Sequence, residues 1–216
     1  MRHALALALC SVAAPLGAHP HIFVDTGLEI ILDDRNRVTH IRVTWEYDEL
    51  YSLLITEDLG VDDDYDGVLS PSDREALTGF DANWIEGYNG DLVATLGGEP
   101  LSLSGPMEPT AELTDGKIVT THLRAVEGAP QLRAPLVLKP FDATYYTAYE
   151  VGRPVTVTGQ AACDIDLDPP DMEAALAMTE DDLAQIPEDP ERAEAMGFGD
   201  IGERFATEVR VTCATS

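Results

Sequence analysis

Two histidines, His19 and His21, stand one residue apart directly after a short apolar run that ends at Ala18. Cleavage after Ala18 would place a free amine and two imidazoles at the new amino terminus. In a β-strand, residues two positions apart point to the same face, so both rings can approach one ion. Imidazole is a ligand for Zn²⁺, Ni²⁺ and Cu²⁺. The spacing therefore predicts a transition-metal site at the mature amino terminus.

This terminal site needs further ligands from elsewhere in the chain. A chelate made by the amine, two deprotonated amides and a third-position histidine is not available, because Pro20 has no amide proton. The remaining histidines of the mature chain, which we take as additional candidate ligands, are His40 and His122. Candidate oxygen donors are Asp25, Glu46 and Asp48. The alternative is an exposed terminus without metal, since chain termini are often loosely held.

A second candidate site is the acidic segment 62–73, which fits the twelve-residue EF-hand loop. A hard cation such as Ca²⁺ takes six to eight oxygens, and alternate positions of a tight loop can supply them. Gly67 stands at the sixth position, where the backbone must turn sharply. The predicted calcium ligands, with Val68 acting through its carbonyl, are Asp62, Asp64, Asp66, Val68, Ser70 and Asp73.

The last position of this segment departs from the EF-hand pattern. Asp73 stands where glutamate is usual, and its shorter side chain should weaken calcium binding or favour magnesium. A bound calcium ion is expected to be structural, because sensor proteins use paired loops and a switching surface. The alternative is an acidic link between two helices that binds no ion.

Other residue groups are weaker candidates for chemistry. Glu46, Asp48 and Glu49 form a carboxylate cluster that would supply the acids of an envelope hydrolase, although such clusters are usually solvated helix starts. Methionines are soft Cu(I) ligands, but helical ones are usually packing residues; those concerned are Met172, Met178 and Met196. The sequence contains no nucleophile elbow, phosphate loop or zinc-protease helix. We therefore predict a non-enzymatic protein.

The amino-terminal segment has the features of a signal peptide. Arg2 precedes an apolar stretch over residues 4–14, and Ala18 supplies a small residue at the cleavage point. The apolar stretch is too short to span a bilayer. We expect an exported protein, cleaved after Ala18 and without stable membrane insertion. The mature chain would then keep two cysteines, Cys163 and Cys213, which predict a disulfide; two free thiols are the alternative.

The charge balance limits the partners that the protein can have. The chain carries 13 Lys and Arg against 40 Asp and Glu, a formal net charge of −27. Phosphate groups repel such a protein, which excludes nucleic acid and disfavours anionic membrane surfaces. A solvated acidic surface explains most of this charge, and the same surface attracts cations.

The elements that must position these residues are mainly strands. Alternating apolar residues predict an antiparallel hairpin of strands 21–32 and 38–47, and Asp115-Gly116 predicts a second hairpin turn. Further strands are predicted over 91–96, 112–113, 118–126, 135–138, 154–162 and 205–212. Helices are predicted over 48–59, 71–78 and 171–186, and an acidic loop over 187–204.

These elements predict an α+β fold that is mainly antiparallel β, with an EF-hand-like helix-loop-helix insertion. After a signal peptide over residues 1–18, we expect one β-rich domain over 19–216. The helical insertion would occupy 48–80, and a helix followed by an acidic loop would occupy 171–204.

Five segments of the chain are distinctive when taken together: His19-Pro20-His21-Ile22-Phe23-Val24-Asp25, residues 44–52, residues 62–67, residues 139–149 and the closing residues 205–213. They resemble a bacterial family known as domain-of-unknown-function family 1007, over nearly the whole mature chain. Its members are commonly labelled periplasmic components of an uncharacterised ABC-type transport system, alongside nickel/cobalt-type membrane transporters. The resemblance implies a periplasmic location and an inner-membrane metal transporter as partner, and it assigns no ligand residue.

Together these observations predict a periplasmic, non-enzymatic accessory protein of a nickel/cobalt/zinc-type transport system, with a calcium-stabilised loop. A calcium-stabilised protein-interaction module that binds no transition metal is the alternative. An envelope hydrolase is the second alternative.

Overall fold

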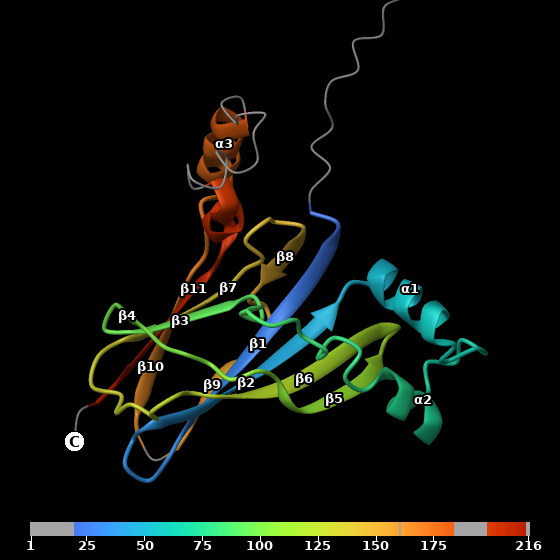
Figure 1. Cartoon of the computed structure of the whole chain (residues 1–216), viewed down its shortest axis with the longest axis horizontal. Coiled ribbons are helices and arrows are strands. Elements are labelled where there is room, and N and C mark those ends of the chain that lie inside the picture. The colour runs from blue at the N-terminus through green and yellow to red at the C-terminus, as the bar shows by residue number, and fades with distance from the viewer. Residues whose placement is uncertain (1–19, 160, 184–197, 215–216) are drawn as a thin grey trace, which may run out of the picture.

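The computed structural model describes residues 20–159, 161–183 and 198–214 of the chain (Figure 1). The predicted signal peptide and His19 lie outside the described residues. The described chain folds into two sheets whose strands pair mostly antiparallel, together with three α-helices. This architecture confirms the expected mixture of helices with mainly antiparallel β structure.

The first sheet is built around the amino-terminal hairpin. Its strands follow the order β5-β6-β2-β1-β8, and β9 also pairs with β1. The predicted hairpin is confirmed, with Ile30 opposite Ile41 and Thr26 opposite Trp45. The strands are β1 (Ile22–Leu32), β2 (Val38–Tyr47), β5 (Met107–Thr114), β6 (Lys117–Ala125), β8 (Thr147–Glu150) and β9 (Val155–Thr158).

The turn between β5 and β6 also follows its sequence prediction. Asp115 and Gly116 both have positive φ values, 52° and 76°. Two successive positive φ values are typical of the type I′ turn, whose twist matches that of antiparallel strands. Thr114 pairs with Lys117 across this turn, so the hairpin closes with a two-residue loop.

The other edge of β1 pairs in parallel, which the sequence did not predict. β8 covers the first part of β1 and β9 the second. Between them, Leu28 donates its N–H to the Pro154 carbonyl at 3.1 Å. Gly27 permits this approach, because a Cβ there would lie 3.1 Å from the Arg153 Cβ. Parallel pairing needs a long crossover connection, and no local sequence pattern specifies such a contact.

The second sheet contains the carboxy-terminal strand and the disulfide. Its order is β10-β11-β7-β3-β4. Cys163 and Cys213 stand opposite each other on β10 and β11 and form a disulfide, so this prediction is confirmed. Of these strands, β4 and β10 were not predicted. The strands are β3 (Leu92–Leu96), β4 (Glu99–Pro100), β7 (Leu136–Pro140), β10 (Cys163–Asp168) and β11 (Glu208–Cys213).

One hydrophobic cluster joins the inner faces of the two sheets. Ile41 and Val43 of β2 are buried in it, together with Leu136 and Leu138 of β7. The predicted alternation along β2 is confirmed, since its inward positions are buried and its outward positions are not. Facing sheets of this kind derive most of their stability from such apolar burial.

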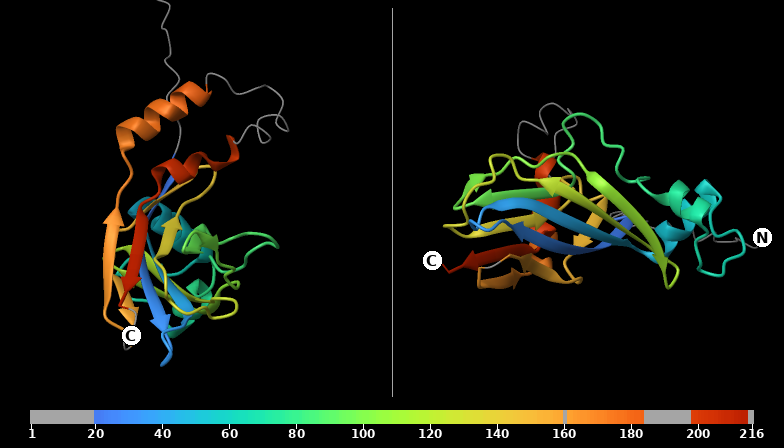
Figure 2. Two further views of the ribbon diagram at one scale, coloured as in Figure 1. Left: turned by 90° about the vertical axis from the view of Figure 1, so that its left-hand side faces the viewer. Right: turned by 90° about the horizontal axis from the view of Figure 1, so that it is seen from below.

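The helices lie at the margins of the sheets. α1 (Glu49–Leu59) and α2 (Pro71–Leu77) sit together at one end of the first sheet, whereas α3 (Met172–Leu183) projects from the second (Figures 1 and 2). α3 contacts η1 (Phe198–Phe205), a 3₁₀-helix. None of the described helices is long and apolar enough to cross a membrane.

The predicted acidic loop over 187–204 is wrong at its carboxy-terminal end, where η1 begins at Phe198. The reason is tertiary. The ring of Phe205 stacks on Tyr145 with centroids 3.9 Å apart, and Gly202 donates its N–H to the Ala143 carbonyl at 3.0 Å. Residues 184–197 of the predicted helix and loop lie outside the described residues.

Candidate metal centre

The acidic segment connects α1 to α2, and both helices end on it with well-formed caps. Gly60 closes α1 in the left-handed conformation, and its N–H points to the carbonyls of Thr56 and Glu57. Ser70 opens α2 as its N-cap. On either side of the exposed loop, Val61 and Leu69 are buried against the body of the protein. The segment is therefore anchored at both ends while its acidic middle faces solvent.

Three of the predicted calcium ligands come together in this loop. Asp62, Asp64 and Asp66 each offer a carboxylate oxygen, and these oxygens lie within 4.8 Å of one another. Gly67 has a φ of 75° and donates its N–H to Asp62 at 3.1 Å, while Val68 donates to Asp66 at 2.8 Å. The turn at Gly67 thus folds the loop so that alternate aspartates converge.

Of the other three predicted ligands, Asp73 is the one with a carboxylate, and it is not part of this group. Asp73 forms a reciprocal capping box with Ser70: its carboxylate accepts the Ser70 N–H at 3.0 Å, and its own N–H donates to the Ser70 hydroxyl at 3.2 Å. The short Asp73 side chain is held at the start of α2 and does not reach the carboxylate group.

The surroundings of the loop are strongly acidic. Between Asp48 and Asp73 the chain has no lysine or arginine. α1 carries Glu57 and Asp58 in its last turn with no basic residue there. The carbonyl end of a helix already carries partial negative charge, so these carboxylates repel it. A cation bound here would relieve both this repulsion and that among the three clustered aspartates.

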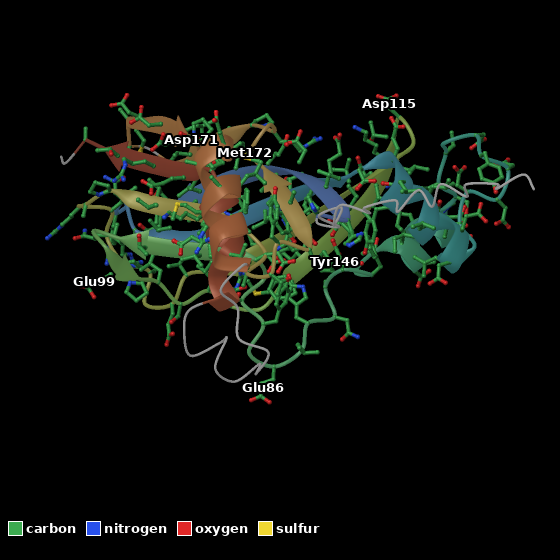
Figure 3. The ribbon with its side chains drawn as sticks, turned by 90° about the horizontal axis from the view of Figure 1, so that it is seen from above. Glu86, Glu99, Asp115, Tyr146, Asp171 and Met172 are labelled. Atoms are coloured by element: carbon green, nitrogen blue, oxygen red, sulfur yellow. A yellow bond between two sulfur atoms is a disulfide. The ribbon has the colours of Figure 1, made fainter. Side chains whose placement is uncertain are left out.

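Of the histidines proposed for a transition-metal site, His21 lies immediately before β1. Its backbone N–H donates to the Tyr146 carbonyl at 2.8 Å, and its ring lies 4.7 Å from that of Tyr146, centroid to centroid. Figure 3 shows Tyr146 near the centre of the view from above. His19, the other member of the pair, lies outside the described residues.

His40 cannot share an ion with His21, which corrects the candidate site. His40 pairs with Ile31, near the far end of β1. About ten residues of strand separate Ile31 from His21, which corresponds to about 30 Å at the usual rise of a β-strand. The two imidazoles therefore lie at opposite ends of the hairpin.

His122 is excluded from that site by its burial. It stands opposite Val43 on the inner face of β6 and is 3% exposed, with its ring 4.7 Å from Trp45 and 5.3 Å from Trp84 between centroids. Its Nε2 atom has no hydrogen-bond partner among the described residues. Burial, together with the charge of Arg124, lowers the pKa of His122 to about 3.

The predicted oxygen donors near the amino terminus are engaged in structural contacts. Asp48 caps α1 by accepting the Tyr51 N–H at 2.9 Å and also accepts the Phe23 N–H at 2.8 Å. Glu46 forms ion pairs with Lys117 and Arg153. In the Glu46, Asp48 and Glu49 cluster, Glu46 and Asp48 therefore have structural partners. Glu49 is an exposed residue of α1.

Asp25, Glu46 and Asp48 nevertheless line one shallow cavity of about 260 Å³ on the outer face of the first sheet. Asp25 stands opposite both Glu46 on β2 and Glu150 on β8, which places three carboxylates in a row across three strands. The N–H of Gly152 donates to Asp25 at 2.7 Å.

Two half-buried carboxylates were missed by the sequence reasoning. Asp81 accepts hydrogen bonds from the hydroxyls of Tyr47 at 2.9 Å and Thr120 at 2.6 Å, and Asp91 accepts one from Tyr149 at 2.8 Å. Burial raises the pKa of both carboxyl groups. The donors come from distant strands, so no local spacing could identify them.

Tyr149 has both a packing role and a hydrogen-bonding role. It packs against Trp45, with ring centroids 5.8 Å apart, and its hydroxyl donates the partly buried hydrogen bond to Asp91. Tyr146 is by contrast 47% exposed. The methionines Met172 and Met178 are exposed on α3, and Met196 lies outside the described residues.

Comparison with known proteins assigns this chain to a family. The family model described as protein of unknown function (DUF1007) matches residues 4–213, nearly the whole chain. Comparison with curated proteins gives no match. The chain therefore belongs to the DUF1007 family of proteins of unknown function.

Proposed function

We propose that this chain is an exported, non-enzymatic protein whose EF-hand-like loop, residues 62–73, binds calcium and thereby stabilises the end of the molecule that carries α1 and α2. The observation that carries the proposal is the convergence of Asp62, Asp64 and Asp66, whose ligand oxygens lie within 4.8 Å. Three carboxylates at this separation repel one another, and a hard divalent cation with oxygen ligands removes the repulsion.

The loop is coupled to the fold through its two buried ends. Val61 and Leu69 are 4% and 9% exposed, and Leu69 belongs to the main hydrophobic cluster. An ion that holds the loop in this conformation also holds these side chains in place. Binding free energy therefore adds to the free energy of unfolding, because the unfolded chain offers no preformed site.

Calcium titration of the mature, chelator-treated protein tests this proposal. We expect calcium to raise the melting temperature, with a stabilisation of about 2.7 kcal/mol when free calcium is 100 times the dissociation constant. The variant Asp62→Asn/Asp64→Asn/Asp66→Asn should lose both the heat of binding and the melting shift.

Asp63→Asn is the matched control, since Asp63 lies in the same exposed loop but outside the carboxylate group. It should keep calcium binding within a small factor. Equal calcium affinities for the wild type and the triple variant would overturn the proposal, as would an equal loss of affinity in Asp63→Asn.

A second candidate function is the delivery of a transition metal to an inner-membrane transporter through the mature amino terminus. It is supported by the position of His21, which directly precedes β1 and lies beside the aromatic ring of Tyr146. On this proposal His19 and His21 bind Zn²⁺, Ni²⁺ or Cu²⁺ together with the terminal amine. His40 and His122 take no part.

Titration of correctly processed protein with zinc, nickel and copper tests this second function. The His19→Ala/His21→Ala variant should bind at least tenfold more weakly than the wild type. His40→Ala is the control and should bind like the wild type, because His40 lies at the far end of the hairpin. Equal affinities for the wild type and the double variant would remove the site.

A further inference from the structure

Three leucines of α1 point away from the protein, whereas its Tyr51 and Ile55 pack against the hydrophobic cluster. Leu50, Leu53 and Leu54 are 65%, 46% and 57% exposed, whereas the buried residues of the helix are Ser52 and Thr56. Surface helices normally bury their apolar stripe and expose their polar one. An exposed apolar stripe of this kind is typical of an interaction surface.

Ser52 explains why the helix is oriented in this way. Its hydroxyl accepts the Ile118 N–H of β6 at 2.9 Å and donates to the Tyr47 carbonyl of β2 at 3.3 Å. At the start of the helix, Asp48 accepts the N–H groups of Tyr51 and Phe23. Hydrogen bonds to two strands therefore set the rotation of α1, and the leucines are left outward.

The leucine face continues into a hollow beside the acidic loop. Leu53 lines a cavity of about 430 Å³ together with Leu113, Asp66 and Asp115. Asp115 lies at the tip of the β5–β6 hairpin, on the side of the molecule that carries α1 and α2 (Figure 3). The hollow thus has apolar walls from α1 and β5 and acidic walls from the loop and the hairpin turn.

Charge identifies the class of molecule that would fit this face. Along the helix, Glu57 and Asp58 follow Leu50, Leu53 and Leu54 at spacings that continue the same stripe, and both are exposed. The nearest basic residue after them in sequence is Arg74. A calcium ion in the loop would neutralise the clustered aspartates, whereas the negative charges of Glu57, Asp58 and Asp115 would remain. The occupant must therefore supply both apolar side chains and positive charge.

We propose that the outward face of α1, together with the hollow beside Leu53, is a docking site for a cationic amphipathic helix of a partner protein. The apolar anchors of that helix would cover Leu50, Leu53 and Leu54, and its lysine or arginine side chains would meet Glu57, Asp58 and Asp115. Nucleic acid and anionic lipid are disfavoured because the chain carries a net charge of −27. This inference rests on the proposed function in one respect, since the calcium loop forms one wall of the hollow.

Binding of a synthetic peptide to the mature protein tests the docking site. The probe is a fluorescent amphipathic helix of leucine and lysine, about 18 residues or five turns long. Its controls are a scrambled peptide of the same composition and a leucine–glutamate helix. We expect the ordered cationic peptide to bind at least tenfold more tightly than either control. Equal binding of the scrambled peptide would overturn the proposal, because it would show attraction by net charge alone.

The variant Leu50→Gln/Leu53→Gln/Leu54→Gln should weaken binding of the ordered peptide at least tenfold while leaving the circular dichroism spectrum unchanged. The matched control changes exposed apolar residues of the other projecting helix, as Met172→Gln/Leu176→Gln/Met178→Gln. It should bind like the wild type. Equal weakening in the two variants, or none in the α1 variant, would overturn the proposal.

Two further measurements separate this inference from other occupants and from the calcium proposal. If the wild type self-associates and the triple leucine variant of α1 does not, the occupant is a second copy of this chain and the proposal is overturned. If the wild type binds phosphatidylcholine vesicles more tightly than the peptide, the occupant is lipid and the proposal is also overturned. If calcium does not bind, but the wild type still binds the peptide and the leucine variant of α1 does not, the proposed function is wrong and the docking site stands.

Discussion

The imidazole of His122 fills a space between the rings of Trp45 and Trp84, and Arg124 points to the same face of β6. Arg124 is itself buried, donates to the carbonyls of Asn89 and Ser104, and lies 4.9 Å from the centroid of the Trp84 ring. A guanidinium repels a divalent cation, so these surroundings favour a neutral imidazole used for packing.

Replacement of His122 by phenylalanine should make the protein more resistant to acid. The pKa of His122 is about 3 in the folded chain against 6.5 for the ordinary side chain. As the pH falls between these values, the unfolded chain binds a proton that the folded chain does not, and stability decreases by up to about 1.4 kcal/mol per pH unit. Urea unfolding from neutral pH to about pH 4 should show this loss in the wild type and a smaller one in His122→Phe. Parallel pH curves would contradict the assignment.

The half-buried carboxyl group of Asp81 changes stability with pH in the opposite sense to His122 and serves as a control. The folded-state pKa of Asp81 lies above its ordinary value of 3.8, because burial disfavours the charged form. Its contribution to stability is present below pH 3.8 and is lost as the pH rises through the folded pKa. Asp81→Asn should therefore reduce the loss of stability on raising the pH, whereas His122→Phe should reduce the loss on lowering it.

At the scale of elements, α1 shows that a helix can be positioned by hydrogen bonds and leave its leucines in solvent. Ser52 is fully buried, whereas Leu54 is 57% exposed. The helix is attached through the Ser52 hydroxyl and the Asp48 cap, and through Tyr51 and Ile55, which pack against the hydrophobic cluster. Exposed leucines on an attached helix remain available to a partner.

Ser52→Ala should destabilise the protein more than Leu54→Ala does. Removing the Ser52 hydroxyl leaves the buried Ile118 N–H without its acceptor, which costs about 1–3 kcal/mol. Leu54→Ala removes an exposed side chain from a helix that tolerates alanine, so the change should stay within about 0.5 kcal/mol. Urea unfolding of both variants measures the difference, and the reverse order would contradict the orientation of α1.

At the scale of the whole molecule, the carboxy-terminal strand lies inside the second sheet. β11 lies between β10 and β7, and its Val209 and Val211 are fully buried. The Cys163–Cys213 disulfide joins the outer ends of β10 and β11. A disulfide is compatible with an exported protein, since thiols are kept reduced in the cytosol. The last strand of the chain is thus both part of the core and covalently attached to its neighbour.

Loss of this disulfide should lower the free energy of unfolding substantially. The cysteines are 50 residues apart, and for a loop of this length the chain-entropy model gives about 4 kcal/mol. Cys163→Ser/Cys213→Ser should show this loss in urea unfolding, and reduced wild-type protein should behave like the variant. An unchanged midpoint in both samples would show that the bond does not restrict the unfolded chain.

Local patterns in the sequence were sufficient for much of the fold. The β1–β2 hairpin, the Asp115-Gly116 turn, the start of α2 at Ser70-Pro71 and the cysteine pair all depend on residues that are close in sequence or on a single pairing. The parallel pairs of β1, the short strands β4 and β8, and η1 were not predictable, because each depends on a partner brought from far along the chain.

The candidate site divides in the same way. The convergence of Asp62, Asp64 and Asp66 was predictable because all three belong to one tight turn, whose geometry is set locally by Gly67. The separation of His40 and His122 from His21, and the outward direction of the α1 leucines, were decided only by tertiary structure. Strand register and the hydrogen bonds of Ser52 determine them, and both require contacts between elements that no single segment of sequence contains.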